Sequence, residues 1–409
     1  MTDYYPETVK PESQGSLINT GDREFLPKVN GHIHTPYSFS AFEDMEQPFK
    51  MAREEGLSIL GINDFYTTDG YAEFASLAKA SKVFPLFNIE FMSLQKDAQN
   101  SGVRINDPQN PGRVYLSGKG LRYPVSMSTS SLESIRTLQA ESNRQTYTMV
   151  GLLNRFLEKT STGIRFDAAE LQRRLARNLF RERHIAAAVR IAVFEKFSAD
   201  EMRIAALTEI FSGKAPKSDL TNFAALENEI RNNLLKSGGP AFVPEDDKAF
   251  LSLDEVVSLI VDAGGIPCYP VLLDDPQGRF TEFEADYQSM ADTLKSKGIY
   301  MIELIPGRNE RSVLLDFVRF FDQQGFVVTF GSEHNTPQLD PLTLTCRGNT
   351  EMGEELERIN FRGAAIIAAH QYLTARGLSG FPTDQFPSSA ILEDLAGWGK
   401  EIVLNFIRE

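Results

Sequence analysis

The chain is poor in the residues that build exported or membrane-spanning proteins. Its 409 residues include two cysteines, Cys268 and Cys346, which are too few for a disulfide framework and favour a reducing compartment. The longest apolar runs, such as 363–369, fall well short of the ~20 residues that a membrane-spanning helix needs. Residues 1–21 lack a basic stretch followed by an apolar core, so we expect no secretion signal there. These absences predict a soluble, cytoplasmic protein without a membrane partner.

Positive charge is also scarce. The 42 lysines and arginines are outnumbered by 56 aspartates and glutamates, which gives a formal net charge of -14. A field of this sign repels polyanions, so we expect no nucleic-acid partner, and any anionic ligand must be met by a local group of positive residues. The chain also lacks a Gly-x-Ser-x-Gly nucleophile elbow, a phosphate-binding loop of the Gly-x-x-x-x-Gly-Lys-Ser type and a dinucleotide fingerprint. The chemistry must therefore be sought in other residues.

Short strand-like runs alternate with helical patterns near the start of the chain and again after residue 250. The predicted strands are 25–34, 58–63, 83–89, 266–271, 299–305 and 326–330. The predicted helices are 45–55, 70–82, 252–263 and 311–323. Ser252 and Glu255 have the spacing of a capping box at the head of the third of these helices. Such alternation favours βαβ units, so the two blocks are predicted to be halves of one parallel sheet.

The stretch between the two blocks has a different pattern. Residues 107–250 show little strand signal and several helical periodicities, at 132–157, 168–178 and 185–197, so we predict a helical insertion. Its arginines, Arg183 among them, could meet an anionic substrate, although a solvated helix face is their commoner role. The predicted division is an N-terminal extension over 1–26, a barrel over 27–106 and 251–345, the insertion over 107–250, and a helical segment over 346–409 packed on the barrel.

Residues that can bind a metal follow the first three predicted strands. His32 and His34 are two residues apart, so a strand aims both imidazoles at the same point. Asp64 ends the second strand and Glu90 ends the third, where parallel-barrel enzymes place functional groups. Taken alone, the histidines could be a polar strand end and the acids could be helix caps, and capping is the better explanation for Asp64.

The last predicted strand runs into a similar group, Gly331-Ser332-Glu333-His334-Asn335. Glu333 and His334 are adjacent, so only one of them is expected to be aimed at a common ion. The chain has five histidines, and the position of His32, His34 and His334 at strand ends beside acids favours a metal over a set of core histidines. His370 lies in an apolar helical run and is assigned to packing.

The order of these motifs resembles the polymerase and histidinol phosphatase (PHP) family of metal-dependent hydrolases. That family opens with a His-x-His-Thr-like motif, continues with a strand ending in Asp-His and then a glutamate, and closes with Gly-Ser-Asp-x-His. The resemblance spans roughly residues 27–94 and 250–336, and His184 resembles a histidine that the family carries in the intervening segment. It implies an α/β fold, a distorted (β/α)7 TIM-like barrel with a helical insertion, in a family whose members usually bind two or three ions and hydrolyse phosphoesters.

The match departs from the family at several ligand positions. Phe65 replaces the histidine of Asp-His, Tyr269 replaces the histidine of Ala-His-Pro, and Asn335 replaces the histidine of the closing motif. The resemblance implies a first metal site of His32, His34, Glu90 and Glu333, and a second reduced to Glu90 and His184. A third site would be essentially lost.

These residues predict a metal-dependent hydrolase that uses metal-bound water on a phosphoester, with one or two ions of zinc, manganese or iron. The substrate is expected to be a small anionic molecule contacted by Arg183 or Arg308, with Asp64 in a supporting role. Two alternatives remain open. One is a diverged barrel that binds a metal or ligand without catalysis, in which Phe65 and Tyr269 fill the space of lost ligands. The other is a hydrolase of a non-phosphate bond.

Overall fold

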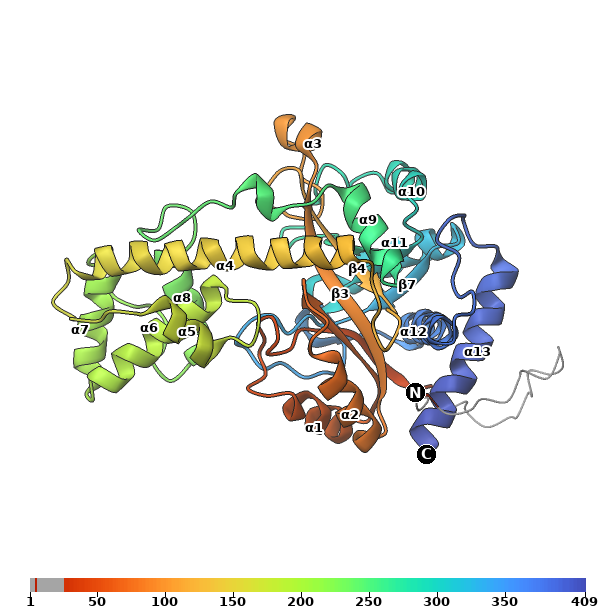
Figure 1. Cartoon of the computed structure of the whole chain (residues 1–409), viewed down its shortest axis with the longest axis horizontal. Coiled ribbons are helices and arrows are strands. Elements are labelled where there is room, and N and C mark those ends of the chain that lie inside the picture. The colour runs from red at the N-terminus through yellow and green to blue at the C-terminus, as the bar shows by residue number, and fades with distance from the viewer. Residues whose placement is uncertain (1–3, 6–25) are drawn as a thin grey trace.

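The strands of the protein form a nearly closed barrel, which a computed structural model describes for residues 4–5 and 26–409 (Figure 1). Most of the predicted N-terminal extension, 1–26, lies outside the described residues. Seven strands form one sheet in sequence order: β1 (Lys28–Ile33), β2 (Leu57–Phe65), β3 (Phe84–Leu94), β4 (Arg113–Lys119), β5 (Ile266–Val271), β6 (Met301–Leu304) and β7 (Val327–Phe330). The barrel closes because the amide of His34 donates to the carbonyl of Glu333 at 2.7 Å, beside the last strand. The predicted distorted TIM-like barrel is confirmed.

Strand β4 makes the barrel irregular. The strands β1 to β3 are parallel, as are β5 to β7, but β4 pairs antiparallel with both β3 and β5. This strand lies inside 107–250, so the predicted start of the helical insertion was placed too early. Its sequence RVYLSGK mixes apolar with polar and charged residues, since Ser117 and Lys119 are buried in the polar interior of the barrel. That mixture weakened the strand pattern in the sequence.

Helices cover the outside of the barrel. They are α1 (Glu46–Glu55), α2 (Tyr71–Ser81), α3 (Lys96–Asn100), α9 (Leu253–Asp262), α10 (Tyr287–Ser296), α11 (Arg311–Gln323), α12 (Glu354–Ala375) and α13 (Ser389–Arg408), with a small hairpin of β8 (Thr345–Cys346) and β9 (Thr350–Glu351). The last two helices pack against each other, and α12 lies across the N-terminal end of the barrel (Figure 1). They approach closely at Gly399, where a Cβ atom would lie 1.7 Å from the carbonyl oxygen of Ala365, so only glycine fits.

The insertion forms a separate helical lobe on one side of the barrel (Figure 1). It contains α4 (Thr129–Leu157), α5 (Ala168–Leu175), α6 (Glu182–Lys196), α7 (Asp200–Ile210) and α8 (Phe223–Leu234). These helices enclose an apolar core of their own, in which Leu153, Val189 and Leu207 are fully buried. The lobe also touches the barrel, since Arg177 pairs with Glu73 of α2 at 2.6 Å.

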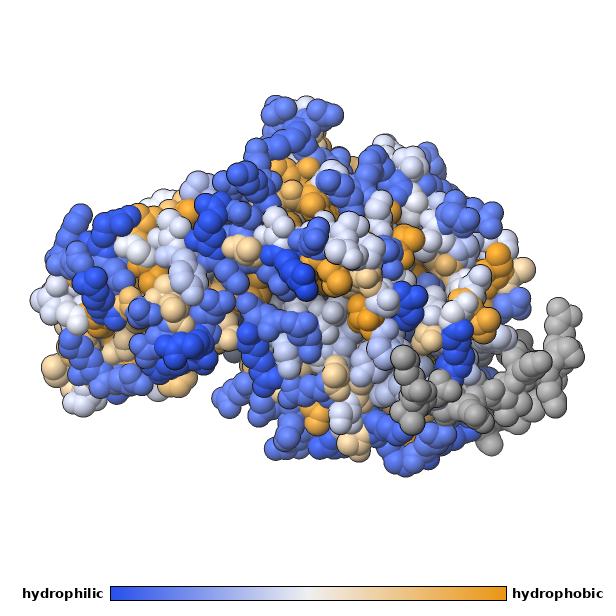
Figure 2. Space-filling model, in the orientation of Figure 1, coloured by the Kyte–Doolittle hydropathy of each residue, from blue (hydrophilic) through white to orange (hydrophobic). Residues whose placement is uncertain are grey.

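Hydrophobic side chains are scattered over the face of the molecule drawn in Figure 2, between hydrophilic ones. The buried apolar residues of the barrel form two clusters. One lies between the sheet and the helices α1, α2, α9, α10 and α11, and the other lies between the sheet and the pair α12 and α13. Among the helices of the described residues, none combines the length and the apolar character that crossing a bilayer requires.

Candidate metal centre

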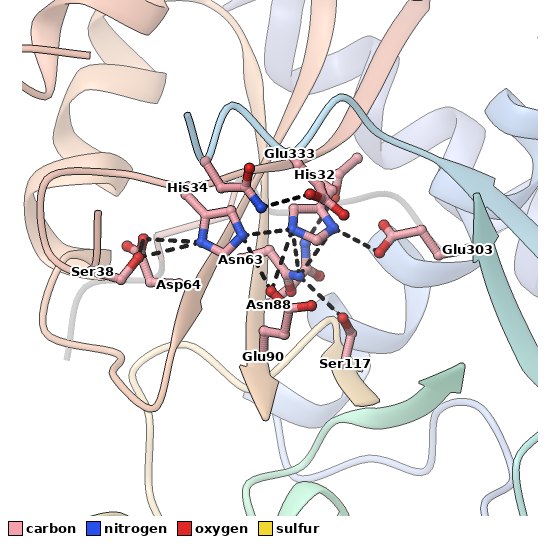
Figure 3. A network of polar contacts seen from close by, with 12 residues as sticks. His32, His34, Ser38, Asn63, Asp64, Asn88, Glu90, Ser117, Glu303 and Glu333 are labelled. Atoms are coloured by element: carbon pink, nitrogen blue, oxygen red, sulfur yellow. Dashed lines mark hydrogen bonds and ion pairs between the residues drawn. The ribbon is translucent and has the colours of Figure 1, made fainter. Parts of the chain in front are cut away.

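Three side chains from β1 and β3 converge at the C-terminal end of the barrel (Figure 3). Nε2 of His32 lies 3.3 Å from Nε2 of His34, and Nε2 of His34 lies 3.2 Å from Oε2 of Glu90. The same oxygen of Glu90 lies 3.9 Å from Nε2 of His32. All three residues are buried, with 1%, 0% and 4% of their surface exposed. Within the part of the chain that the structure describes, no other group of three or more histidines, cysteines or acids lies so close together.

The spacing of these atoms fits a bound divalent ion. Ligand atoms held ~2.0–2.1 Å from zinc at tetrahedral angles lie ~3.3 Å from one another. Two of the three distances in the cluster, 3.3 Å and 3.2 Å, agree with this value. Imidazole nitrogen together with carboxylate oxygen also suits manganese or iron. The donor set therefore fits the predicted cofactor and does not choose among these metals.

Hydrogen bonds on the far side of each imidazole direct both Nε2 atoms into the cluster. Nδ1 of His32 donates to Oε2 of Glu303 at 2.7 Å. The hydroxyl of Ser38 donates to Asp64 at 2.6 Å, so it accepts from Nδ1 of His34 at 3.3 Å. With the hydrogen on Nδ1 of each neutral ring, the two Nε2 atoms face each other as lone pairs, and a shared cation relieves their repulsion.

Burial and neighbouring charges set the protonation of the cluster. Burial lowers the pKa of His34 to about 4, so its ring is neutral at pH 7. Burial raises the pKa of Glu90 to about 8, because the ionised carboxylate is costly away from water. A cation bound beside it would favour the ionised form. Burial alone would raise the pKa of Glu303 too, but the charge of Lys119 and the hydrogen bond from His32 lower its pKa to about 2. One ionised carboxylate therefore stands directly behind the cluster.

A buried amide borders the same space. Nδ2 of Asn63 lies 3.0 Å from Nε2 of His32 and donates to the hydroxyl of Ser117 at 3.1 Å. Its Oδ1 is buried and has no hydrogen-bond partner among the described residues. An unpaired buried acceptor costs roughly 1–3 kcal/mol, so a water or an ion that reached this oxygen would be stabilising.

Asp64 supports the loop that carries His34. One carboxylate oxygen accepts from the amide of Thr35 at 2.7 Å and from the hydroxyl of Ser38 at 2.6 Å, and the other accepts from the hydroxyl of Thr35 at 2.5 Å. The nearest distance from Asp64 to the ring of His34 is 4.0 Å. With both of its oxygens engaged, Asp64 fits the supporting role predicted for it.

The turn after β7 does not add a ligand to the cluster. The carboxylate of Glu333 is paired with Arg308 and accepts from Nδ2 of Asn335 at 2.6 Å. His334 is turned elsewhere, because its Nε2 donates to the carbonyl of Asp340 at 2.8 Å and its Nδ1 contacts a serine hydroxyl. Both residues have positive φ angles, 64° and 52°, which non-glycine residues rarely adopt and which the alternation of a strand cannot predict. Among the described residues neither belongs to the close group of His32, His34 and Glu90, and binding of the ion by Glu333 or His334 stays a prediction.

The residues predicted from the lobe also lie outside the cluster. Nδ1 of His184 accepts from the amide of Arg181 at 3.0 Å, so this histidine caps the start of α6 rather than joining the cluster. The guanidinium of Arg183 lies 5.7 Å from the ring of Phe39, and that ring stacks on His34 at 5.4 Å. Arg183 therefore brings positive charge to within one aromatic ring of the cluster.

Two aromatic rings lie at the positions where the resemblance to the PHP family implied lost histidine ligands. Phe65 stacks on His34 with 5.1 Å between ring centroids. The hydroxyl of Tyr269 donates to Oε1 of Glu284 at 2.9 Å, and the residue is buried. These positions offer packing in place of ligands, as the sequence comparison of motifs implied.

Glu303 and Lys119 contact each other directly behind His32 and were not predicted from the sequence. Glu303 is the single charged residue of the buried strand β6, and Lys119 is the last residue of β4. A lone acid in the apolar run Met301-Ile302-Glu303-Leu304 was the signal that could have identified the first of them.

Comparisons with known proteins show a shared fold. No protein-family model matches the chain, and no curated protein matches it by sequence. A solved structure from Bifidobacterium adolescentis, provisionally described as a metal-dependent phosphoesterase, is similar with a TM-score of 0.52 and 17% identity over 81% of this chain and 94% of that one. An amidohydrolase from Chromobacterium violaceum, solved with sulfate and without metal, gives a TM-score of 0.47 and 18% identity over 78% and 93%. The first likeness supports the barrel fold alone, and the second is too weak to carry an argument.

Proposed function

We propose that this chain is a metal-dependent hydrolase whose ion is held by His32, His34 and Glu90. The observation that carries the proposal is the convergence of two imidazole nitrogens and a carboxylate oxygen, with ligand atoms within 4.8 Å of one another at the C-terminal end of the barrel. A divalent ion in such a place lowers the pKa of a bound water and polarises the bond to be hydrolysed. The chain's own part is to keep the two Nε2 atoms turned toward the cluster, through Glu303 and Ser38.

The proposed substrate is a small phosphoester. Arg308 offers it a positive contact, because its side chain is 45% exposed while its partner Glu333 is 13% exposed. An incoming phosphate would compete with Glu333 for this guanidinium, and Arg183 adds positive charge beyond Phe39. The Bifidobacterium protein that shares the fold is described provisionally as a metal-dependent phosphoesterase. A cytoplasmic location, and the lack of nucleic-acid and membrane partners, are proposed on the composition of the chain.

The proposal is tested by metal content and turnover of the full chain. We expect about one ion per chain after purification without chelator, and hydrolysis of some members of a panel of phosphorylated sugars and nucleotides. His34→Gln should weaken metal binding at least tenfold, while His334→Gln, a histidine equally close in sequence to a strand end, should leave it within twofold. Absence of both metal and turnover in the unaltered chain would overturn the proposal.

A binding barrel without catalysis is the second candidate. It is favoured by Phe65 and Tyr269, which occupy space where a second ion would need ligands, and by the burial of the cluster, of which Glu90 is 4% exposed. One tightly bound ion with no turnover of phosphoesters, carboxylic esters or amides would decide for this candidate. Turnover of an amide but of no phosphoester would keep the hydrolase and change the bond.

A further inference from the structure

Three polar side chains, each in contact with the next, cross the interior of the barrel behind the cluster. Nζ of Lys119 in β4 lies 2.5 Å from Oε1 of Glu303 in β6, and both side chains are 0% exposed. The second oxygen of Glu303 lies 2.7 Å from Nδ1 of His32 in β1, which is 1% exposed. Each residue comes from a different strand, so the closed barrel alone brings them together.

Stability does not explain this arrangement. Removing a lysine and a carboxylate from water costs several kcal/mol for each ion, and their mutual attraction often does no more than offset that cost. Apolar side chains of similar size would pack in the same space without the cost. A fully buried lysine therefore points to a role beyond packing.

The role follows from what an ionised carboxylate can do. It only accepts hydrogen bonds, so a carboxylate at 2.7 Å requires that Nδ1 of His32 carries the hydrogen. Nε2 of that ring is then left with its lone pair, turned toward Nε2 of His34 at 3.3 Å. Lys119 supplies the positive charge that allows a carboxylate to stay ionised in the interior. The second ring, His34, has only a neutral hydroxyl at Nδ1, 3.3 Å away.

We propose that Lys119 and Glu303 are positioning residues of the metal centre, which act through His32 and fix both the orientation and the tautomer of its ring. The inference rests on the proposed function, because it concerns the affinity of the site for an ion. Neither residue is itself a ligand. Outer partners of metal-binding histidines typically change metal affinity by 10–100-fold when they are removed.

The test measures the affinity of the full chain for zinc, by competition with a chromogenic chelator. Glu303→Gln and Lys119→Met are expected to weaken zinc binding ~10–100-fold. The control is Glu227→Gln. It breaks a partly buried ion pair of the lobe, between Glu227 in α8 and Arg190 in α6 at 2.6 Å. It should lower stability and leave zinc affinity within twofold. A purely structural role for Lys119 would give the result of the control.

The tautomer of His32 gives a second readout that needs no metal. The chain has five histidines, so selective 15N labelling resolves their ring nitrogens by NMR. We expect His32 to carry hydrogen on Nδ1 in the unaltered chain, and to lose this preference in Glu303→Gln. Glu303→Gln keeps the size of the side chain, so it tests the positioning role even if Lys119→Met does not fold.

The possible failures are distinguishable. If His32→Ala abolishes zinc binding while Glu303→Gln binds as the unaltered chain does and keeps the tautomer, the positioning role is wrong and the proposed function stands. If the unaltered chain does not bind zinc, manganese or iron at all, the proposed function falls and the positioning role falls with it.

Discussion

At the scale of single residues, the two imidazoles of the candidate centre are held in unlike ways. His32 has an ionised carboxylate behind it, whereas His34 has a serine hydroxyl whose own hydrogen is engaged by Asp64. The tautomer of His34 therefore depends on Asp64, although that residue lies no closer than 4.0 Å to the ring. A buried series of hydrogen bonds of this kind is sensitive to any change that reverses one of them.

Replacing Asp64 with asparagine should show that dependence. The amide would place a donor against hydrogen-bond donors of Thr35 or Ser38, and it frees the serine hydroxyl to donate toward His34. We expect a loss of about 2–3 kcal/mol in the free energy of unfolding and about a tenfold weaker zinc affinity. Urea unfolding and chelator competition measure the two effects. Asp69→Asn, at an exposed position after β2 where an asparagine oxygen can still accept from Asn178, should change stability by less than about 0.5 kcal/mol. Equal stability of Asp64→Asn and the unaltered chain would show that the hydrogen bonds are unimportant.

Sequence could predict the part of the centre that obeys strand periodicity. Two histidines at i and i+2 at the end of one strand share a face, and Glu90 follows the predicted third strand, although β3 itself continues to Leu94. The turn at Glu333 could not be predicted, because its positive φ angle breaks that periodicity. The partner Glu303 could not be predicted either, since its contact with His32 joins residues 271 positions apart and exists only once the barrel has closed.

At the scale of elements, the helices of the barrel agree well with their sequence signals. Helix α11 occupies the predicted 311–323, and α9 begins with the predicted capping box, in which the amide of Ser252 donates to Glu255 at 2.8 Å. Among the seven strands of the barrel, the one not predicted is β4, whose sequence lacks the apolar alternation of a strand. Local chemistry determines a helix cap, whereas a strand that faces a polar interior is determined by the rest of the barrel.

Ser252→Ala should weaken α9 by removing the hydroxyl that accepts from the amide of Glu255, while the backbone amide of residue 252 can still donate to the Glu255 carboxylate. We expect about 1 kcal/mol less stability in urea unfolding, since a backbone N–H group in the first turn loses its acceptor. The control is Ser258→Ala in the same helix, where the hydroxyl donates back to the carbonyl of Asp254 at 2.9 Å. Alanine is the better helix former there, so stability should stay equal or rise slightly. A loss of similar size in both variants would contradict the capping explanation.

Helix α6 of the lobe begins beside a cluster of charges that makes its stability depend on pH. Glu182 accepts from Nη2 of Arg231 at 2.7 Å, and Arg181 lies 3.5 Å away. Burial alone would raise the pKa of Glu182, but the charges of Arg181 and Arg231 hold it well below 4.5. A carboxyl group whose pKa is lower in the folded state stabilises that state above its unfolded pKa, and this contribution is lost as the pH falls below about 4.5.

Glu182→Gln should therefore cost stability at neutral pH and less in acid. At pH 7 we expect a loss of about 2–4 kcal/mol, because the arginines keep their charge in a partly buried place without their partner. The difference from the unaltered chain should shrink steadily as the pH is lowered from 5 to 3, in a series of urea titrations. Glu170→Gln, which removes an exposed pair with Arg174, should have little effect at any pH. A difference that is constant across this range would show that Glu182 acts by packing alone.

At the scale of the whole molecule, the chain has two bodies of apolar core joined by one long helix. The first part of α4 packs in the barrel cluster through Ile135 and Leu138, and its second part packs in the lobe cluster through Met149 and Leu153. Leu179 of the lobe also packs in the barrel cluster, and the other links are polar, such as the pair of Arg177 with Glu73 and the bond from Gln139 to the carbonyl of Tyr66. Polar contacts at a surface couple two cores weakly.

We therefore expect the lobe and the barrel to unfold in separate steps. The single tryptophan, Trp398, lies in α13 and reports only on the barrel, whereas far-UV circular dichroism also reports on the helices of the lobe. In urea, the two signals should give transitions that do not coincide. Glu182→Gln should move the transition seen by circular dichroism and leave the tryptophan transition in place, and Ser252→Ala should move the tryptophan transition. Coincident curves in the unaltered chain and in both variants would mean that α4 couples the two cores into one cooperative unit.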